Sequence, residues 1–283
     1  MTLLGAAQIR ELAAQLDLKP AKSLGQNFVI DSNVCTKIVR TAGVTSDDIA
    51  LEIGPGLGSL TLAMLAVAKS VIAVEIDSRL AQQLPITVAQ YFEHPENLIV
   101  INKDALDVYD LPVAPTVLVA NLPYNVSVPV LLHLLEKFPT LRTGVVMVQA
   151  EVADRLAAKP GGKVYGIPSV KAAWWADVKN VGTVSRSIFW PAPNVDSKLV
   201  GFTRRETAGP EESRAKVFTI IDAAFAQRRK MLRSALSSLY GSSSAAEAIL
   251  IRAGIDPTLR GEALQIESFC KIGSLSNVYK TSH

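Results

Sequence analysis

The strongest constraint on the fold is a regular alternation of short apolar runs with helical patterns through the first two thirds of the chain. Five runs have the length and apolar content of buried strands, namely Ile49–Ile53, Val71–Glu75, Leu98–Asn102, Thr116–Ala120 and Val145–Gln149. Helical patterns lie between them over 59–67, 79–91 and 127–138, the last with Ser127 as its expected N-cap. This alternation predicts an α/β fold with a parallel, doubly wound sheet.

The last third of the chain has a different pattern. Two further runs, Trp175–Val184 and Ser197–Thr203, are expected to extend the sheet, with an antiparallel hairpin as one option. The polar stretch Arg204–Glu212 predicts a linker. Helical patterns then cover 213–225, 230–239, 245–253 and 264–272. We therefore expect two domains, residues 1–205 with an N-terminal helical extension and residues 206–283 as a small all-α domain.

Composition points to a protein of the cytoplasm. Hydrophobic residues make up 49% of the chain, yet no charge-free apolar run approaches the ~20 residues that span a bilayer. Near the N-terminus, Ile9, Leu12 and Leu16 recur at helical spacing, which favours a helix over a signal peptide. Cys35 and Cys270 lie far apart and suggest no disulfide framework. We expect a cytoplasmic protein that does not contact a membrane.

A glycine-rich loop follows the first predicted strand. Residues 52–58 read Glu-Ile-Gly-Pro-Gly-Leu-Gly, and a helical pattern begins directly after them. Glycines let a ligand approach the backbone closely, and a helix N-terminus presents unpaired amides. Glu75 ends the next strand, where a carboxylate can bind ribose hydroxyls, and Asp104 follows the third. Because ligands bind at strand ends in open α/β sheets, these residues predict a nucleoside-containing cofactor there.

The glycine spacing distinguishes between two kinds of cofactor. Nicotinamide and flavin sites have the fingerprint G-x-G-x-x-G/A. In this chain Ser59 occupies the sixth position, and the third glycine, Gly58, comes one residue early. The spacing favours S-adenosylmethionine, which has no pyrophosphate to cradle. A nicotinamide oxidoreductase stays the alternative from another class of enzyme.

The tetrapeptide Asn121-Leu122-Pro123-Tyr124 follows the fourth predicted strand and suits a site that grips a planar amine. The Asn121 amide and the Leu122 carbonyl can accept hydrogen bonds, Pro123 stiffens the turn, and the Tyr124 ring offers a face for stacking. The lone pair of such an amine is delocalised, so positioning it against a methyl donor is the main source of rate. A structural Asn-Pro turn is the simpler alternative.

Eight segments, spread almost from end to end of the chain, match the sequence motifs of a known enzyme family. The segments are 22–28, 52–58, 75–77, 104–106, 121–124, 162–166, 189–193 and 225–230. With them the chain resembles the ribosomal RNA adenine dimethyltransferases, in particular those of the small subunit. The resemblance implies a class I S-adenosylmethionine-dependent methyltransferase fold, with a mostly parallel, seven-stranded, Rossmann-like sheet and a small helical C-terminal domain.

The resemblance also implies an activity and residue roles. The expected reaction is dimethylation of the 6-amino group of two adjacent adenosines in a terminal loop of small-subunit (16S) ribosomal RNA, within an immature 30S-type particle. The expected cofactor residues are Asn27, Val29, Gly54, Glu75, Asp104 and Asn121. Phe189 is implied as the second aromatic that sandwiches the target base with Tyr124. A monomer without a metal site is expected.

Charge is distributed unevenly and suggests a polyanionic partner. Residues 1–150 carry 10 basic and 14 acidic side chains, a net charge of −4, whereas residues 151–283 carry 19 and 12, a net charge of +7. Arg228, Arg229, Lys230 and Arg233 cluster where a C-terminal helix is expected to start. We expect them to contact RNA phosphates without reading bases. A helix face paired with its own acids is the alternative.

Three other functions stay open at this point. A large-subunit dimethylase of the antibiotic-resistance type is closely similar, but segments 165–166 and 225–230 match the small-subunit enzymes better. The second is a glutamine-amide methyltransferase, which uses a related Asn-Pro-Pro-Tyr tetrapeptide. Leu122 and the basic second half of the chain argue against this alternative. The third alternative is a ribosome-assembly factor that keeps the fold without catalysis.

Overall fold

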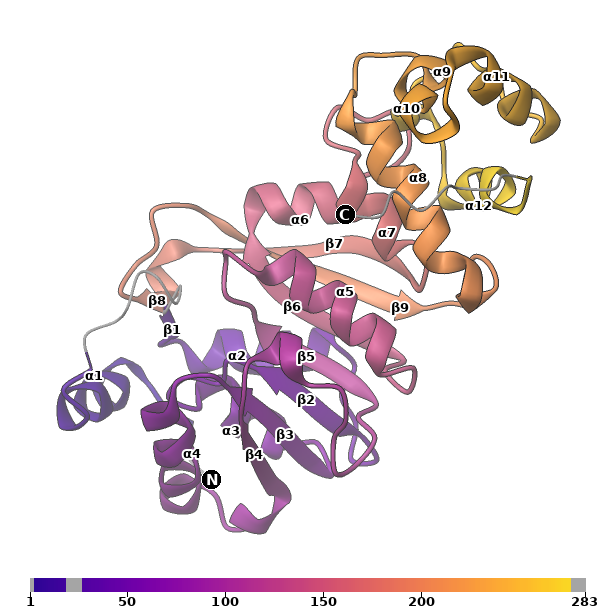
Figure 1. Cartoon of the computed structure of the whole chain (residues 1–283). Coiled ribbons are helices and arrows are strands. Elements are labelled where there is room, and N and C mark those ends of the chain that lie inside the picture. The colour runs from indigo at the N-terminus through magenta and orange to yellow at the C-terminus, as the bar shows by residue number, and fades with distance from the viewer. Residues whose placement is uncertain (1–2, 19–26, 276–283) are drawn as a thin grey trace. The chain divides into compact units, whose positions relative to one another are not determined.

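The computed structural model of the chain describes residues 3–18 and 27–275 (Figure 1). These fall into two compact units. The first comprises Met1–Ala153 and Lys179–Arg204, and the second comprises Asp154–Val178 and Arg205–His283. One join between the two units falls at Arg204–Arg205, whereas the sequence predicts a single boundary between residues 205 and 206. The structure adds Asp154–Val178 to the second unit, because α7 (Ile167–Ala172) packs against α8 (Arg214–Ala226). The division into two domains, residues 1–205 and 206–283, stays a prediction.

A seven-stranded sheet forms the centre of the first unit, and the predicted fold class is confirmed. Its strand order is β4-β3-β2-β5-β6-β9-β7. The strands are β2 (Ile49–Ile53), β3 (Ser70–Glu75), β4 (Leu98–Asn102), β5 (Val117–Asn121), β6 (Thr143–Gln149), β7 (Ala176–Val184) and β9 (Ser197–Arg204). The five strands from β4 to β6 are parallel, and β9 runs antiparallel to β6. The two later runs therefore extend the sheet as expected.

The continuous apolar runs of the sequence have a direct explanation. Side chains on β2, β3, β5 and β6 are buried along nearly their whole length, so both faces of these strands are covered. Strands buried on both faces carry near-continuous runs of Val, Ile and Leu rather than alternating ones. The helices of this unit are α1 (Ala6–Gln15), α2 (Ser32–Thr41), α3 (Ser59–Leu65), α4 (Ser78–Tyr91), α5 (Ser127–Lys137) and α6 (Ala150–Leu156), the last continuing into the second unit.

One expected helix cap is wrong. Ser127 is the first residue of α5, and Val126 occupies the N-cap position without a side-chain hydrogen bond. Ser127 is buried, and its hydroxyl donates to the Tyr124 carbonyl at 3.5 Å instead. The first residue of α5 is thus hydrogen-bonded to the last residue of the Asn121–Tyr124 segment.

A two-stranded antiparallel ladder lies beside the main sheet. It pairs β1 (Phe28–Val29) with β8 (Phe189–Trp190), with Val29 opposite Phe189. The Ser59 hydroxyl at the start of α3 donates to the Val29 carbonyl at 2.6 Å. The ladder therefore connects two segments that are 160 residues apart in the chain to the start of α3.

The second unit is helical, as expected for the C-terminal region. Besides α7 and α8 it contains α9 (Leu232–Ala235), α10 (Ser237–Tyr240), α11 (Ser243–Arg252) and α12 (Ile266–Leu275). The single helix expected over 230–239 is two short ones, α9 and α10, separated at Leu236. The first amides of α9 donate to the Leu259 and Pro257 carbonyls outside the helix. Within this unit Phe218 stands edge-on to Trp174 and Trp175 in the core. No helix among residues 3–18 and 27–275 is long and apolar enough to cross a membrane.

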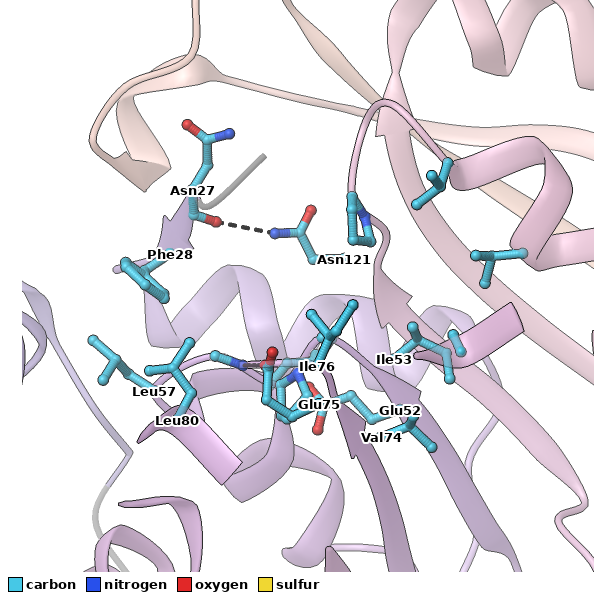
Figure 2. Close-up of a pocket in the computed structure, with 18 of the residues that line it drawn as sticks. Asn27, Phe28, Glu52, Ile53, Leu57, Val74, Glu75, Ile76, Leu80 and Asn121 are labelled. Atoms are coloured by element: carbon cyan, nitrogen blue, oxygen red, sulfur yellow. Dashed lines mark hydrogen bonds between the residues drawn. The ribbon is translucent and has the colours of Figure 1, made fainter. Parts of the chain in front are cut away.

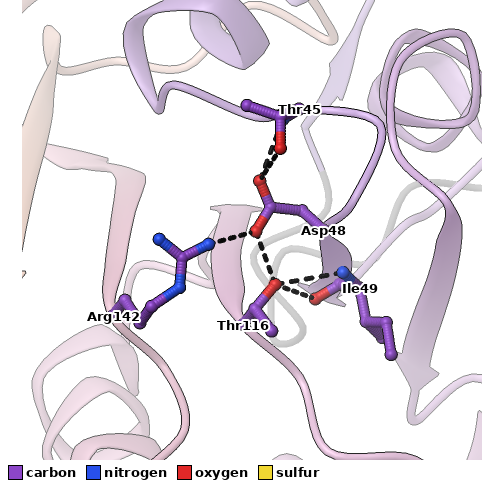
Figure 3. Close-up of polar contacts among 5 residues, drawn as sticks. All are labelled: Thr45, Asp48, Ile49, Thr116 and Arg142. Carbon is purple, nitrogen blue, oxygen red and sulfur yellow. Dashed lines mark hydrogen bonds and ion pairs between the residues drawn. The ribbon is translucent and has the colours of Figure 1, made fainter.

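A buried carboxylate ties together the starting ends of three strands (Figure 3). Asp48 precedes β2 and accepts hydrogen bonds from the Thr45 amide and hydroxyl, from the Thr116 hydroxyl before β5, and from Arg142 before β6. The Thr116 hydroxyl oxygen also accepts from the Ile49 amide at 3.0 Å. Burial raises the pKa of Asp48, but these hydrogen bonds and the Arg142 charge outweigh it, so the pKa is lowered overall.

Substituting Asp48→Asn should destabilise the fold by about 1–3 kcal/mol at pH 7, because an amide cannot accept from all four donors. Since the folded-state pKa is lowered, the stabilisation is complete above the ordinary Asp pKa of about 3.9 and is lost as the pH falls through the lower folded value. Urea unfolding at pH 7 and pH 3 measures this. The exposed neighbour Asp47→Asn is the control, and an equal loss in both variants would contradict the assignment.

Candidate functional site

The main pocket of the first unit lies where the strand order reverses. Successive strands step outward from β2 to β4, and the chain then returns to place β5 on the other side of β2. Ligand sites of open α/β sheets form at such switch points. A cavity of about 220 Å³ opens there at the carboxyl ends of β2, β3 and β5 (Figure 2). Its lining includes all six residues expected to bind the cofactor, namely Asn27, Val29, Gly54, Glu75, Asp104 and Asn121.

The glycine loop forms one wall of the pocket and needs its glycines. Gly54 and Gly56 have φ angles of +68° and +58°, a region that side chains with a Cβ rarely adopt. A Cβ at Gly56 would lie 2.9 Å from the Phe28 ring. One at Gly54 would point toward the Asn121 carbonyl and Pro123, 3.8–3.9 Å away. Larger residues would therefore fill the space beside the loop.

Glu75 closes the pocket at the end of β3. Its side chain accepts hydrogen bonds from the Gly56 amide at 3.2 Å and from the Asp77 amide at 2.9 Å. Burial raises the pKa of Glu75, and the two amide hydrogen bonds partly offset that effect. A carboxylate whose two oxygens are held in place by backbone amides is suited to a vicinal diol such as ribose.

Apart from Val29, sequence reasoning assigned no role to the apolar residues of the pocket. Phe28, Leu57, Ile76 and Leu80 line it together with the polar groups (Figure 2). Ile76 is 50% exposed although it is a large apolar side chain. The available signal was its place directly after Glu75, because an exposed apolar residue beside a carboxylate expected to bind ribose can cover the face of a base.

Asn121 presents an unsatisfied acceptor at this pocket. Its side-chain nitrogen donates to the Asn27 carbonyl at 3.1 Å, which fixes the orientation of the amide (Figure 2). The side-chain oxygen is buried and has no hydrogen-bond partner among the described residues. Buried polar atoms without partners are rare because each costs about 1–3 kcal/mol. The oxygen is therefore placed to accept a hydrogen bond from a ligand.

The other residues expected at the reaction centre do not all line the pocket. Pro123 lines the pocket, whereas Leu122 is 1% exposed and packs into the core. Tyr124 is half-buried, with its hydroxyl 2.8 Å from that of Ser197. Phe189 is 3% exposed on β8 and belongs to the core. No ring contact in the described part of the chain joins Tyr124 to Phe189, so the aromatic sandwich stays a prediction.

A second carboxylate lies beneath the glycine loop. Glu52 is fully buried and accepts a 2.6 Å hydrogen bond from the Thr61 hydroxyl. Burial raises the pKa of Glu52 to about 8, with the Thr61 hydrogen bond opposing the shift and the Glu75 charge adding to it. Glu52 is therefore largely protonated at neutral pH, which lowers the charge repulsion between the two carboxyl groups near the loop.

The raised pKa of Glu52 predicts an unusual pH dependence of stability. The folded protein retains a proton that the unfolded chain releases near pH 4.5, so this contribution is complete below that pH and is lost as the pH rises through about 8. Glu52→Gln, which mimics the neutral acid, should flatten the fall in melting temperature between pH 5.5 and 8.5. Calorimetry on both proteins measures it. A steeper fall in the variant would contradict the protonated state.

Of the four cations expected to bind RNA at a helix start, only Arg233 lies in the helix, in the first turn of α9. Arg228, Arg229 and Lys230 lie in the turn between α8 and α9, with the Lys230 amide bonded to the Gln227 carbonyl. Arg228 pairs with Glu262 at 2.8 Å and donates to the Gly162 and Lys163 carbonyls, and Arg233 pairs with Glu247 at 3.4 Å. Arg229 and Lys230 are exposed and form no ion pair within the described ranges. The expected segment 22–26 lies outside the described residues.

The fold and the site together define a class of protein. A mostly parallel seven-stranded sheet with a glycine loop, Glu75 and Asp104 at successive strand ends is the arrangement of an S-adenosylmethionine-dependent methyltransferase. The sequence model of the ribosomal RNA adenine dimethylase family matches residues 18–277 of this chain. The chain therefore belongs to the ribosomal RNA adenine dimethylase family.

Named relatives support this membership. Ribosomal RNA small subunit methyltransferase A of Streptomyces griseus is 60% identical over 273 residues, covering 95% of this chain and 94% of that protein. The protein of the same name from Leifsonia xyli is 57% identical and covers 97% and 99%.

Two solved structures are also similar to this chain. A dimethyladenosine transferase from Plasmodium falciparum has a TM-score of 0.72 at 26% identity, covering 87% of this chain and 95% of that one. The 23S rRNA methyltransferase ErmE has a TM-score of 0.67 at 26% identity, covering 88% and 98%.

Proposed function

We propose that this enzyme dimethylates the 6-amino groups of two adjacent adenosines in a terminal loop of small-subunit ribosomal RNA during ribosome biogenesis. The observation that carries the proposal is the buried, unpartnered side-chain oxygen of Asn121 at the pocket. The small-subunit choice is supported by relatives of that name at 53–60% identity, against 26% for the 23S enzyme ErmE. The substrate is expected within an immature subunit and the enzyme as a cytoplasmic monomer.

The residues of the pocket fit S-adenosylmethionine. Glu75 would hold the ribose hydroxyls, Asp104 would accept from the adenine amino group, and Ile76 would cover a face of the adenine. The backbones of Asn27 and Gly54 would lie against the rest of the cofactor. When bound, S-adenosylmethionine supplies an electrophilic methyl group on a positively charged sulfur.

The role of Asn121 follows from its amide orientation. An exocyclic adenine nitrogen donates hydrogen bonds, and the free Asn121 oxygen can accept one of them. The Asn27 carbonyl prevents the amide from turning its nitrogen toward the substrate, because that nitrogen is already bonded. Leu122 would offer its carbonyl as a second acceptor. Two acceptors fix the direction of the nitrogen lone pair, and correct orientation of reacting groups is a major source of rate.

Asn121→Ala should reduce methyl transfer by about 10²–10³-fold, the range expected for losing an orienting group. Cofactor affinity should weaken less than about tenfold, because the other pocket contacts remain. The measurement uses labelled methyl donor with undermethylated small subunits, followed by nucleoside analysis, and calorimetry for the cofactor. The exposed Asn33→Ala variant is the control. Turnover at the wild-type rate in Asn121→Ala would refute the proposal.

The exposed cations of the second unit are proposed to hold RNA phosphates. Arg229 and Lys230 are exposed next to a turn whose Lys159 and Lys163 are also exposed. Arg228 fixes that turn through the Gly162 and Lys163 carbonyls, and the Gly161 amide donates to the Glu262 carbonyl. Arg228 and Arg233 are paired with carboxylates, so they are expected to contribute less to phosphate binding than Arg229 and Lys230.

Arg229→Ala/Lys230→Ala should lower the slope of log affinity against log salt by about 1.4–1.8, since each neutralised phosphate contributes about 0.7–0.9. Binding to small subunits across a salt series measures the slope. Lys271→Ala on α12 removes an exposed cation outside this group and should leave the slope nearly unchanged. An unchanged slope in the double variant would remove these residues from the RNA contact.

A further inference from the structure

The phenol of Tyr124 is bonded to a residue on a different strand. Its oxygen lies 2.8 Å from the Ser197 hydroxyl, and either group can donate. Ser197 is the first residue of β9 and is 1% exposed. Tyr124 belongs to the turn after β5, and β6 lies between β5 and β9 in the sheet. The hydrogen bond therefore spans the end of an intervening strand and joins residues that are 73 positions apart.

The position of Ser197 is fixed independently of Tyr124. In the antiparallel ladder Ser197 faces Gln149, and the Ala150 amide donates to the Asp196 carbonyl at 2.8 Å. The backbone beside Tyr124 is also held, because the Leu122 amide donates to Met147 and the Val126 amide donates to Pro123. With both backbones held, the main freedom left is rotation of the tyrosine side chain. The hydroxyl pair removes that freedom.

We propose that Ser197 is a positioning residue that fixes the plane of the Tyr124 ring against which the target base stacks. This inference rests on the proposed function. A stacking wall is effective only when its plane matches that of the base while Asn121 holds the amine. Neither Ser197 nor Tyr124 lines the cofactor pocket, so the pair acts on the substrate side alone.

The hydrogen bond between Tyr124 and Ser197 also predicts how the melting temperature changes in single and double variants. Removing one hydroxyl leaves the other without its partner, whereas removing both leaves nothing unpaired. Ser197 is almost fully buried, so Tyr124→Phe should lower the melting temperature. The double variant Ser197→Ala/Tyr124→Phe should regain part of that loss. The ring itself is kept in all three variants.

The experiment measures methyl transfer to undermethylated small subunits by the full chain. Ser197→Ala and Tyr124→Phe should each lower kcat by about tenfold, and the double variant should show the same tenfold loss rather than about a hundredfold. Cofactor affinity by calorimetry should stay within about twofold of wild type in all three. The exposed Ser46→Ala variant is the control and should match wild type.

Several outcomes would overturn the inference. Wild-type kcat in both single variants, or losses that multiply in the double variant, would show that the two hydroxyls do not act as a unit. Tyr124→Ala separates this inference from the proposed function. If Tyr124→Ala and Asn121→Ala lose activity while Ser197→Ala and Tyr124→Phe do not, only the positioning role fails. If Asn121→Ala keeps full turnover, the proposed function itself fails.

Discussion

The structure depends most on the parallel register of β2 between β3 and β5. That register places Ile53 beside Val74, and the carboxyl ends of all three strands meet at one edge of the sheet. The glycine loop, Glu75 and Asn121 consequently line one cavity although the chain separates them by up to about 70 residues. The Asp48 cluster sits at the opposite ends of the strands and ties β2 to β5 and β6 through side-chain hydrogen bonds. Parallel strands need such alignment because no tight turn fixes their register.

Electrostatics in this cavity follow from burial. Two carboxyl groups lie close to the glycine loop, and full charge on both would be costly in a buried site. Burial raises the pKa of both groups, to about 8 for Glu52 beneath the loop, while amide hydrogen bonds to Glu75 partly oppose the effect there. Glu75 and Asp104 both line the pocket, and the cofactor carries a positive charge on sulfur. The buried oxygen of Asn121 adds an acceptor at the substrate side.

Much of the fold and of the cofactor pocket could be predicted from sequence. Strand candidates Ile49–Ile53 and Leu98–Asn102 match the observed strands at both ends, because buried parallel strands have a strong apolar signal bounded by polar turns. Three expectations went differently for physical reasons. Ser127 does not cap α5, the helix expected over 230–239 is two short helices, and Arg228 is held by Glu262 and two carbonyls. Ser127 is bonded to its near neighbour Tyr124, whereas the partners of Arg228 lie 34 and 66 positions away, where no local pattern encodes them.

The sequence by itself determined the order of elements, the glycine loop, and the polar residues placed at strand ends, because apolar periodicity and backbone conformation are local properties. Only the tertiary structure decided which way the Asn121 amide points, since this depends on the Asn27 carbonyl 94 residues away. It also decided that Ile76 is exposed at the pocket and that Phe189 is packed in the core. The same holds for the pairing of Tyr124 with Ser197, which exists only because β9 returns beside β6.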